Sequence, residues 1–137
     1  MTFRGFATIN FWADDVSAAA AWYTQLLQLE PYFTQVGPDG QPVYIEFRIG
    51  ADQDELGIVD RRYSPPGPEL GPGGAIMYWH ADDLDATLAQ LRTMGATDHQ
   101  PVTPRGNSGF ITASVLDPFG NIIGVMQNPH YLQMHAR

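Results

Sequence analysis

The amino-acid sequence predicts an α+β protein built from two copies of a βαβββ module in tandem. The first observation is a repeat: Ala-Asp-Asp-Val at 13–16 returns as Ala-Asp-Asp-Leu at 81–84. The second is that an alternating apolar run precedes each copy and a helical pattern follows it. The third is a Pro/Gly-rich segment, 64–74, between the copies. Because Pro and Gly interrupt helices and strands, this segment is expected to be a linker.

Each module is expected to begin with a strand and a helix. Residues 6–13 and 75–81 are rich in the aromatic and β-branched side chains that strands favour. The Asp pairs that follow are interpreted as helix caps and not as catalytic carboxylates, because they directly precede a helical period. That period places apolar side chains at positions Val16, Ala19, Ala20, Tyr23, Leu26 and Leu27, and at Leu84, Leu88, Leu91 and Met94.

Three short strands are expected after each helix. They fall at 31–36, 43–49 and 55–60 in the first half, and at 99–103, 110–116 and 121–127 in the second. Turn-forming residues at 37–40 and 117–121 separate neighbouring strands. The predicted organisation is a first module at 1–63, the linker at 64–74, a second module at 75–128 and a short tail at 129–137.

Composition narrows the classes of function. The chain has 137 residues and a formal charge of −8, and its seven cations are all Arg. This acidic balance argues against nucleic acid as a partner, because phosphates require a basic surface. There is no Cys, which excludes disulfides and thiolate metal sites. No signal peptide and no apolar run of about 18 residues is present, so a cytoplasmic protein without a membrane partner is expected.

The segment 115–126, Val-Leu-Asp-Pro-Phe-Gly-Asn-Ile-Ile-Gly-Val-Met, together with the duplicated modules and their Asp-Asp helix openings, resembles the vicinal oxygen chelate superfamily. This superfamily includes glyoxalase I, the extradiol dioxygenases, the fosfomycin-modifying enzymes and the bleomycin-resistance proteins. The resemblance implies that the curled sheets form a cup with a ligand site inside it, and that two chains pair as a homodimer. The Asp-Pro-x-Gly-Asn turn is its most specific motif, and it reports fold more than chemistry.

The resemblance also implies positions for a divalent metal, whose His, Gln or Glu ligands would fall at Thr8, Gly57, Ile76 and Gly124. None of these four residues offers an imidazole or a carboxylate. The family's metal site is therefore expected to be missing, and no other cofactor is predicted.

Alternation along the strands places further side chains on the faces of these four positions. The predicted ligand-binding residues are Thr8, Asn10, Trp12, Tyr44, Glu46, Arg48, Gly57, Ile76, Tyr78, His80, Gly124 and Met126. The two glycines are expected to leave space at the floor of the cup. For Trp12 and Tyr78 core packing is an equal alternative, and Glu46 with Arg48 could be a plain ion pair.

Three functions are compatible with these residues. The first is non-enzymatic binding and sequestration of a small aromatic or cationic natural product, as in antibiotic resistance, with the negative charge attracting the ligand. The second is a metal-independent lyase, isomerase or dioxygenase of glyoxalase-like ancestry, with His80 or Glu46 as catalytic base. The third is an accessory module whose ligand has been lost. The missing metal ligands and the aromatic side chains of the predicted cup favour the first.

Overall fold

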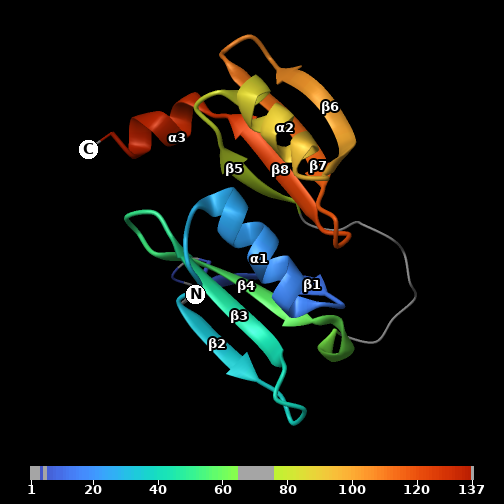
Figure 1. Cartoon of the computed structure of the whole chain (residues 1–137). Coiled ribbons are helices and arrows are strands. Elements are labelled where there is room, and N and C mark those ends of the chain that lie inside the picture. Colours follow the sequence, from blue (N-terminus) through green and yellow to red (C-terminus); the bar gives the residue numbers. More distant parts are fainter. Residues whose placement is uncertain (1–3, 5, 65–75, 137) are drawn as a thin grey trace. The chain divides into compact units, whose positions relative to one another are not determined.

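A computed structural model describes residues 4, 6–64 and 76–136, and the chain divides into two compact units, Met1–Pro68 and Glu69–Arg137. Each unit has the predicted βαβββ order (Figure 1). Apart from Ser64, the predicted linker lies outside the described residues, as does Ala75 at the start of an expected strand.

The first unit is one four-stranded mixed sheet with a helix on one face. Its elements are β1 (Thr8–Ala13), α1 (Val16–Leu27), β2 (Phe33–Val36), β3 (Pro42–Ile49), β4 (Asp54–Asp60) and the short 3-10 helix η1 (Arg61–Tyr63). The strand order is β1-β4-β3-β2; β1 runs parallel to β4 and the other pairs are antiparallel.

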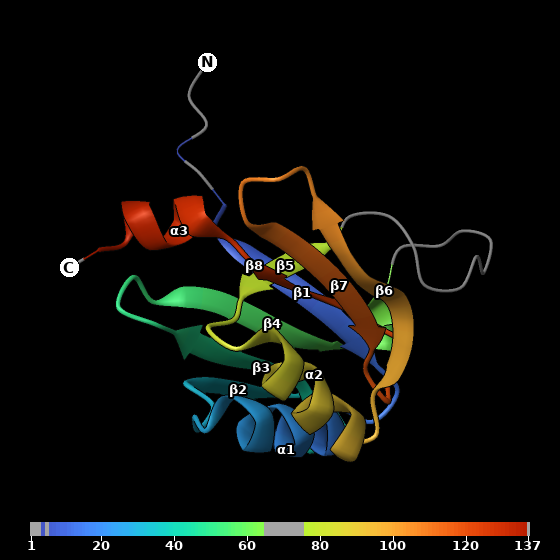
Figure 2. The ribbon, with the colours of Figure 1, turned by 90° about the horizontal axis from the view of Figure 1, so that it is seen from above.

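Helix α1 begins where the sequence predicts it. The side chain of Asp15 accepts a hydrogen bond from the Ala18 backbone N–H at 3.0 Å, which satisfies one of the free donors of the first turn. The helix contacts β1, β3 and β4. It lies on one side of the sheet (Figure 2). Its Tyr23 ring packs 5.8 Å from that of Phe11, and both side chains are buried. One face of the first sheet thus holds the apolar core of this unit.

The second unit repeats this architecture. Its elements are β5 (Met77–His80), α2 (Leu84–Thr93), β6 (Thr97–Arg105), β7 (Phe110–Leu116), β8 (Ile122–Gln127) and α3 (Pro129–Met134). The strand order is β5-β8-β7-β6, again with one parallel pair, β5 with β8. The side chain of Asp83 caps α2 by accepting from the Ala86 N–H at 3.0 Å.

The Asp-Pro-x-Gly-Asn turn owes its shape to one buried carboxylate. Asp117 Oδ1 accepts from the backbone N–H groups of Phe119 at 2.9 Å and Asn121 at 2.8 Å. Its Oδ2 accepts from the Asn121 side-chain amide at 2.9 Å. Asp117 is only 4% exposed, so the carboxylate exchanges water for donors that the turn itself supplies.

The observed bounds differ from the predicted ones mainly at element ends. Strand β1 begins at Thr8 instead of residue 6, and Phe6 is exposed. The predicted tail contains helix α3, which Asn128 caps and Pro129 opens, a pairing suited to a helix start. None of the described helices is long and apolar enough to span a membrane.

Candidate functional site

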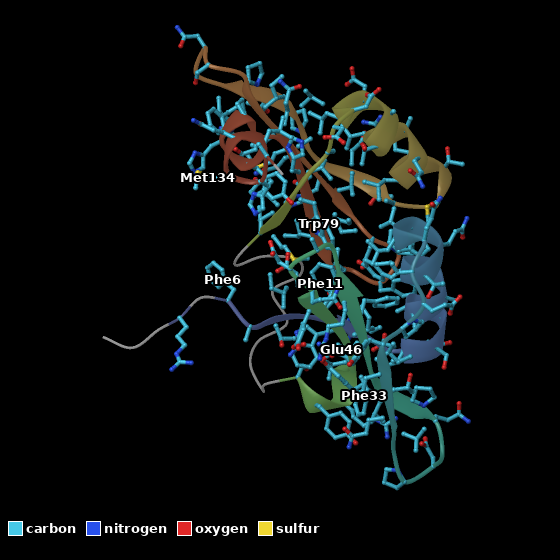
Figure 3. All side chains as sticks on the ribbon, turned by 90° about the vertical axis from the view of Figure 1, so that its left-hand side faces the viewer. Phe6, Phe11, Phe33, Glu46, Trp79 and Met134 are labelled. Carbon is cyan, nitrogen blue, oxygen red and sulfur yellow. The ribbon has the colours of Figure 1, made fainter. Side chains whose placement is uncertain are left out.

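The face of the first sheet opposite α1 carries the predicted site residues of this unit; we call it the first open face. Along β3, Val43, Ile45 and Phe47 are buried toward the core. Three alternate residues of β3 and the residues paired with them across β4 and β1 form the first open face: Tyr44, Glu46, Arg48, Glu55, Gly57, Val59, Thr8, Asn10 and Trp12. Phe33 of β2 is the strand partner of Glu46, and both are labelled in Figure 3.

Glu46 is the centre of a hydrogen-bonded network on the first open face. Its Oε1 accepts from the Tyr44 hydroxyl at 2.8 Å, and its Oε2 accepts from Arg48 Nε at 3.0 Å. Arg48 also places an Nη2 3.0 Å from Glu55 Oε1, while Glu55 Oε2 accepts from the Thr8 hydroxyl at 2.5 Å. The Glu46 side chain is only 12% exposed. The network therefore joins three strands through partly buried charges.

The network changes the protonation equilibria of its members. Burial, followed by the hydrogen bond to Glu46, raises the pKa of Tyr44 to about 12. The hydrogen bond to Glu46 also raises the pKa of Arg48. The Arg48 guanidinium lies over the Tyr32 ring, 4.2 Å from its centre. This cation–π contact helps to hold the guanidinium in place. Arg48 is thus held by two carboxylates and one aromatic ring.

Glu55, Tyr32 and Phe33 belong to this site and are missing from the sequence prediction. Glu55 stands two residues before Gly57 in β4, so strand alternation could have placed it on the same face. Tyr32 precedes β2 and has no such periodicity. Tyr32 contacts Arg48 because of the course that the backbone takes before β2, which strand alternation does not predict.

The expectation that Gly57 and Gly124 leave free floor space is wrong. A β-carbon on Gly57 would lie 2.3 Å from Asn10 Oδ1 and 2.7 Å from Tyr44 Cε1. On Gly124 it would lie 2.6 Å from Tyr78 Cδ1 and 2.8 Å from Ile76 Cγ2. The reason is the close spacing of neighbouring strands, which lets large side chains fold over a glycine. Both glycines are therefore packing positions.

The second sheet has an equivalent face opposite α2, here called the second open face. Tyr78 pairs with Gly124 and His80 with Met126 across β5 and β8. On the neighbouring strand β7, Ser114 pairs with Gly124 and Thr112 pairs with Met126, so both lie on the same face. Ser114 Oγ lies 2.8 Å from His99 Nδ1, and Thr112 Oγ1 accepts from Arg105 Nε at 3.0 Å. These polar pairs are not among the residues predicted from sequence, although alternation along β7 indicates Ser114 and Thr112.

His80, the predicted catalytic base of the enzymatic alternative, has both ring nitrogens engaged. Its Nδ1 accepts from the Asn128 backbone N–H at 3.2 Å. Its Nε2 lies 3.1 Å from Asp82 Oδ1, so the neutral ring carries its proton on Nε2. The Tyr131 ring stacks on the imidazole at a centroid distance of 5.1 Å. A general base needs a lone pair directed at substrate, and here that lone pair is directed at backbone.

The four family positions do not fit a divalent metal. Gly57 and Gly124 have no side chain, Ile76 is apolar, and the Thr8 hydroxyl donates to Glu55. Within residues 4, 6–64 and 76–136, no three His, Asp or Glu side chains are grouped so that they could hold a metal ion.

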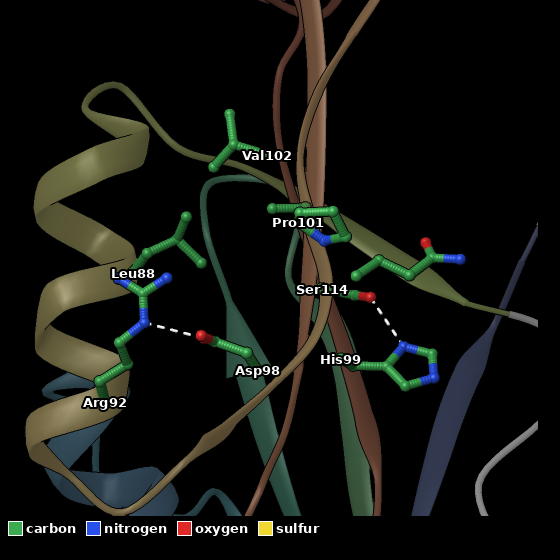
Figure 4. A pocket seen from close by; sticks show the side chains of 9 residues that line it. Leu88, Arg92, Asp98, His99, Pro101, Val102 and Ser114 are labelled. Atoms are coloured by element: carbon green, nitrogen blue, oxygen red, sulfur yellow. Dashed lines mark hydrogen bonds and ion pairs between the residues drawn. The ribbon is translucent and has the colours of Figure 1, made fainter.

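A cavity of about 230 Å³ lies between α2 and β6 in the second unit (Figure 4). Shifts of register between Asp98 and Thr103 bend β6 at this place. Arg92 and Asp98 are joined across the cavity at 2.8 Å, whereas His99 points away from α2 to Ser114. None of the predicted site residues lines it, and it is smaller than most ligand pockets, which hold about 300–1,000 Å³.

The comparisons with known proteins agree with this fold. A family model described as the Glyoxalase/Bleomycin resistance protein/Dioxygenase superfamily matches residues 5–125. No curated protein matches the sequence.

Several solved structures are similar. A glyoxalase/bleomycin resistance protein from Catenulispora acidiphila DSM 44928 is 27% identical, with a TM-score of 0.59 over 89% of this chain and 96% of that one. One from Streptomyces sp. CB03234 is 24% identical, with a TM-score of 0.61 over 90% and 100%. A glyoxalase family protein from Enterococcus faecalis is 18% identical, with a TM-score of 0.70 over 93% and 100%.

The resemblance seen in the duplicated modules and the Asp-Pro-x-Gly-Asn turn is thereby confirmed, because the family model covers most of the chain. The chain belongs to the Glyoxalase/Bleomycin resistance protein/Dioxygenase superfamily.

Proposed function

We propose that this protein binds and sequesters a small aromatic or cationic natural product on its open faces, as in antibiotic resistance. The observation that carries the proposal is the network around Glu46. A sheet face that only packs against protein is expected to bury apolar side chains. The first open face instead keeps Glu46, Arg48 and Glu55 partly buried and mutually oriented, at a cost in desolvation that a bound ligand would explain.

The charge and the aromatic side chains of the first open face indicate the kind of ligand. Two carboxylates surround a single guanidinium, so the network has one unbalanced negative charge, and the whole chain has −8. This charge would attract a cation. The rings of Tyr32 and Phe33 are 65% and 49% exposed beside it, and Trp12 lies on the same face. Stacking on such rings would hold a flat molecule.

The enzymatic alternative is a lyase, isomerase or dioxygenase that works without a metal. Glu46 is its remaining candidate base, because the lone pair of His80 is taken by Asn128. The Tyr44 hydroxyl, 2.8 Å from Glu46, would be the nearest proton donor. Sequestration explains the same residues without a reaction and is the simpler function.

We also propose that the protein acts without metal or other cofactor, as a homodimer in the cytoplasm, with no nucleic-acid or membrane partner. The four family metal positions, Thr8, Gly57, Ile76 and Gly124, offer no imidazole or carboxylate ligand, and this supports independence from metal. Membership of a family whose resemblance implied pairing of two chains supports the homodimer, and light scattering of the purified protein would test it. A monomer at micromolar concentration would contradict it.

The decisive experiment is a thermal-shift screen with tryptophan fluorescence. The panel contains aromatic DNA-damaging natural products, cationic glycopeptides, α-keto-aldehyde adducts and divalent metals. A ligand at 100 times its Kd stabilises the folded protein by about 2.7 kcal/mol. We expect an aromatic or cationic compound to raise Tm and to remain chemically unchanged.

Glu46→Gln should weaken this binding at least about tenfold, a loss of roughly 1.4 kcal/mol. Glu30→Gln is the matched control, since it removes the same charge from an exposed position outside the site. Turnover of a panel compound would establish the enzymatic alternative instead. A response to metals alone would contradict independence from metal, and no response at all would favour the accessory module.

A further inference from the structure

Helix α3 is attached to the second open face through one histidine. The Asn128 N-cap holds the helix start, because its side chain accepts from the Tyr131 N–H at 2.9 Å. The backbone N–H of the same Asn128 donates to His80 Nδ1 at 3.2 Å. A side chain of strand β5 therefore fixes the point at which α3 begins.

The attachment is completed by a stack of three rings. Tyr131 lies over His80 with an angle of 14° between the rings. His135 also stacks on Tyr131, at a centroid distance of 4.2 Å and an angle of 21°. As a result the His80 side chain is only 7% exposed, although its strand neighbour Tyr78 is 37% exposed. Tyr131 is thus the cover over His80.

The rest of α3 contributes little to holding it in place. The helix has six residues and buries none of them, and Leu132 and Met134 are 50% and 64% exposed. A helix this short is not stable by itself in water. Segments with few buried contacts open locally at a small fraction of the free energy of global unfolding. The stack on His80 and the hydrogen bond from Asn128 therefore restrain α3, beside the Pro129 ring, which lies close to Gly109.

We propose that α3 is a displaceable strap that controls access to the second open face at His80. In the closed state Tyr131 covers the imidazole and Asn128 occupies its Nδ1. In the open state both restraints are released together, and the His80 ring and the neighbouring Met126 become accessible to a ligand. This inference rests on the proposed function in that the ligand site includes the second open face. It gives that site a regulated entrance.

Chemical modification of His80 tests the strap without any ligand. Diethyl pyrocarbonate acylates accessible imidazole nitrogens, and peptide mass spectrometry reports each histidine separately. Tyr131→Ala in the full chain should accelerate the modification of His80 at least tenfold and increase hydrogen exchange in 128–134. Leu132→Ala is the control: it truncates an exposed side chain of the same helix and should leave both rates unchanged. Tyr131→Phe keeps the ring and should also leave them unchanged.

Equal modification rates for Tyr131→Ala and the parent protein would overturn the strap, as would equal acceleration by Leu132→Ala. A second readout uses the aromatic dye 1-anilinonaphthalene-8-sulfonate. Its fluorescence should rise with Tyr131→Ala and not with Leu132→Ala, because only the former uncovers the second open face. Failure of the proposed function is a separate outcome: the compound panel would give no ligand, while the reactivity of His80 would still depend on Tyr131.

Discussion

Tyr78 lies across Gly124, with its Cδ1 2.6 Å from the place that a β-carbon on Gly124 would occupy. In the first unit Asn10 and Tyr44 cover Gly57 in a similar way. These two glycines stand where the family resemblance implies metal-binding carboxylates. In this chain the volume that such a side chain would need is already filled by its neighbours.

Gly124→Ala should therefore destabilise the protein, by roughly 1–3 kcal/mol, as overpacking commonly does. Gly57→Ala should cost less. The reason is that the new methyl group on residue 124 would also meet the Met77 backbone oxygen at 2.9 Å, whereas the three atoms nearest to a methyl group on residue 57 belong to side chains. Chemical denaturation of both variants measures the difference. The double variant Asn10→Ala/Gly57→Ala should recover part of the loss, and no recovery would contradict the packing explanation.

The raised pKa of Tyr44 makes a pH-dependent prediction. A tyrosine whose pKa rises from 10.0 to about 12 on folding is stabilised in its protonated form by the folded state. Its contribution to stability is complete below pH 10 and is lost as the pH rises toward 12. Ultraviolet titration of phenolate should show a late-titrating component that is lost in Tyr44→Phe. In Glu46→Gln its midpoint should fall, because the anionic hydrogen-bond acceptor is gone. A late midpoint that persists in Tyr44→Phe would assign it to another residue.

Arg48 separates two carboxylates, and its removal should expose their repulsion. Arg48→Gln is expected to lower the free energy of unfolding at low salt, and to lower it by less at high salt, because the partners are partly exposed. The double variant Arg48→Gln/Glu55→Gln should recover most of this loss, since it removes one of the two like charges. Denaturation at two salt concentrations measures both effects. A loss independent of salt and of Glu55 would point to packing instead.

The Asp117 carboxylate should be the most sensitive part of the Asp-Pro-x-Gly-Asn turn. Asp117→Ala leaves the backbone N–H groups of Phe119 and Asn121 without this acceptor, at a cost of about 1–3 kcal/mol for each group that finds no other partner. In Asp117→Asn, an NH2 group would replace the oxygen that accepts from the Asn121 side-chain amide. Two hydrogen-bond donors would then face each other. Exchanging the two residues, Asp117→Asn/Asn121→Asp, should restore stability in thermal denaturation relative to the single variant. Equal stability of all three variants would contradict this role.

Most of the fold could be predicted from local sequence because its signals act over short distances. Asp15 and Asp83 cap their helices through N–H groups three residues away, and Asp117 builds its turn within four residues. Alternation along β3 likewise predicted that Tyr44, Glu46 and Arg48 share a face. These features require no knowledge of distant parts of the chain.

The use of each face was decided only by tertiary structure. Alternation tells which side of a strand a residue occupies, but strand register and side-chain rotamers decide what it reaches. Glu55 meets Thr8 and Arg48 because β4 lies between β1 and β3. His80, predicted as a base, instead accepts from Asn128, 48 residues later. The sequence by itself therefore determined the modules and their caps, turns and faces. Contacts between separate strands joined Glu55 and Thr8 to Glu46 and Arg48, covered the two glycines and attached α3, because such contacts exist only once the strands have paired.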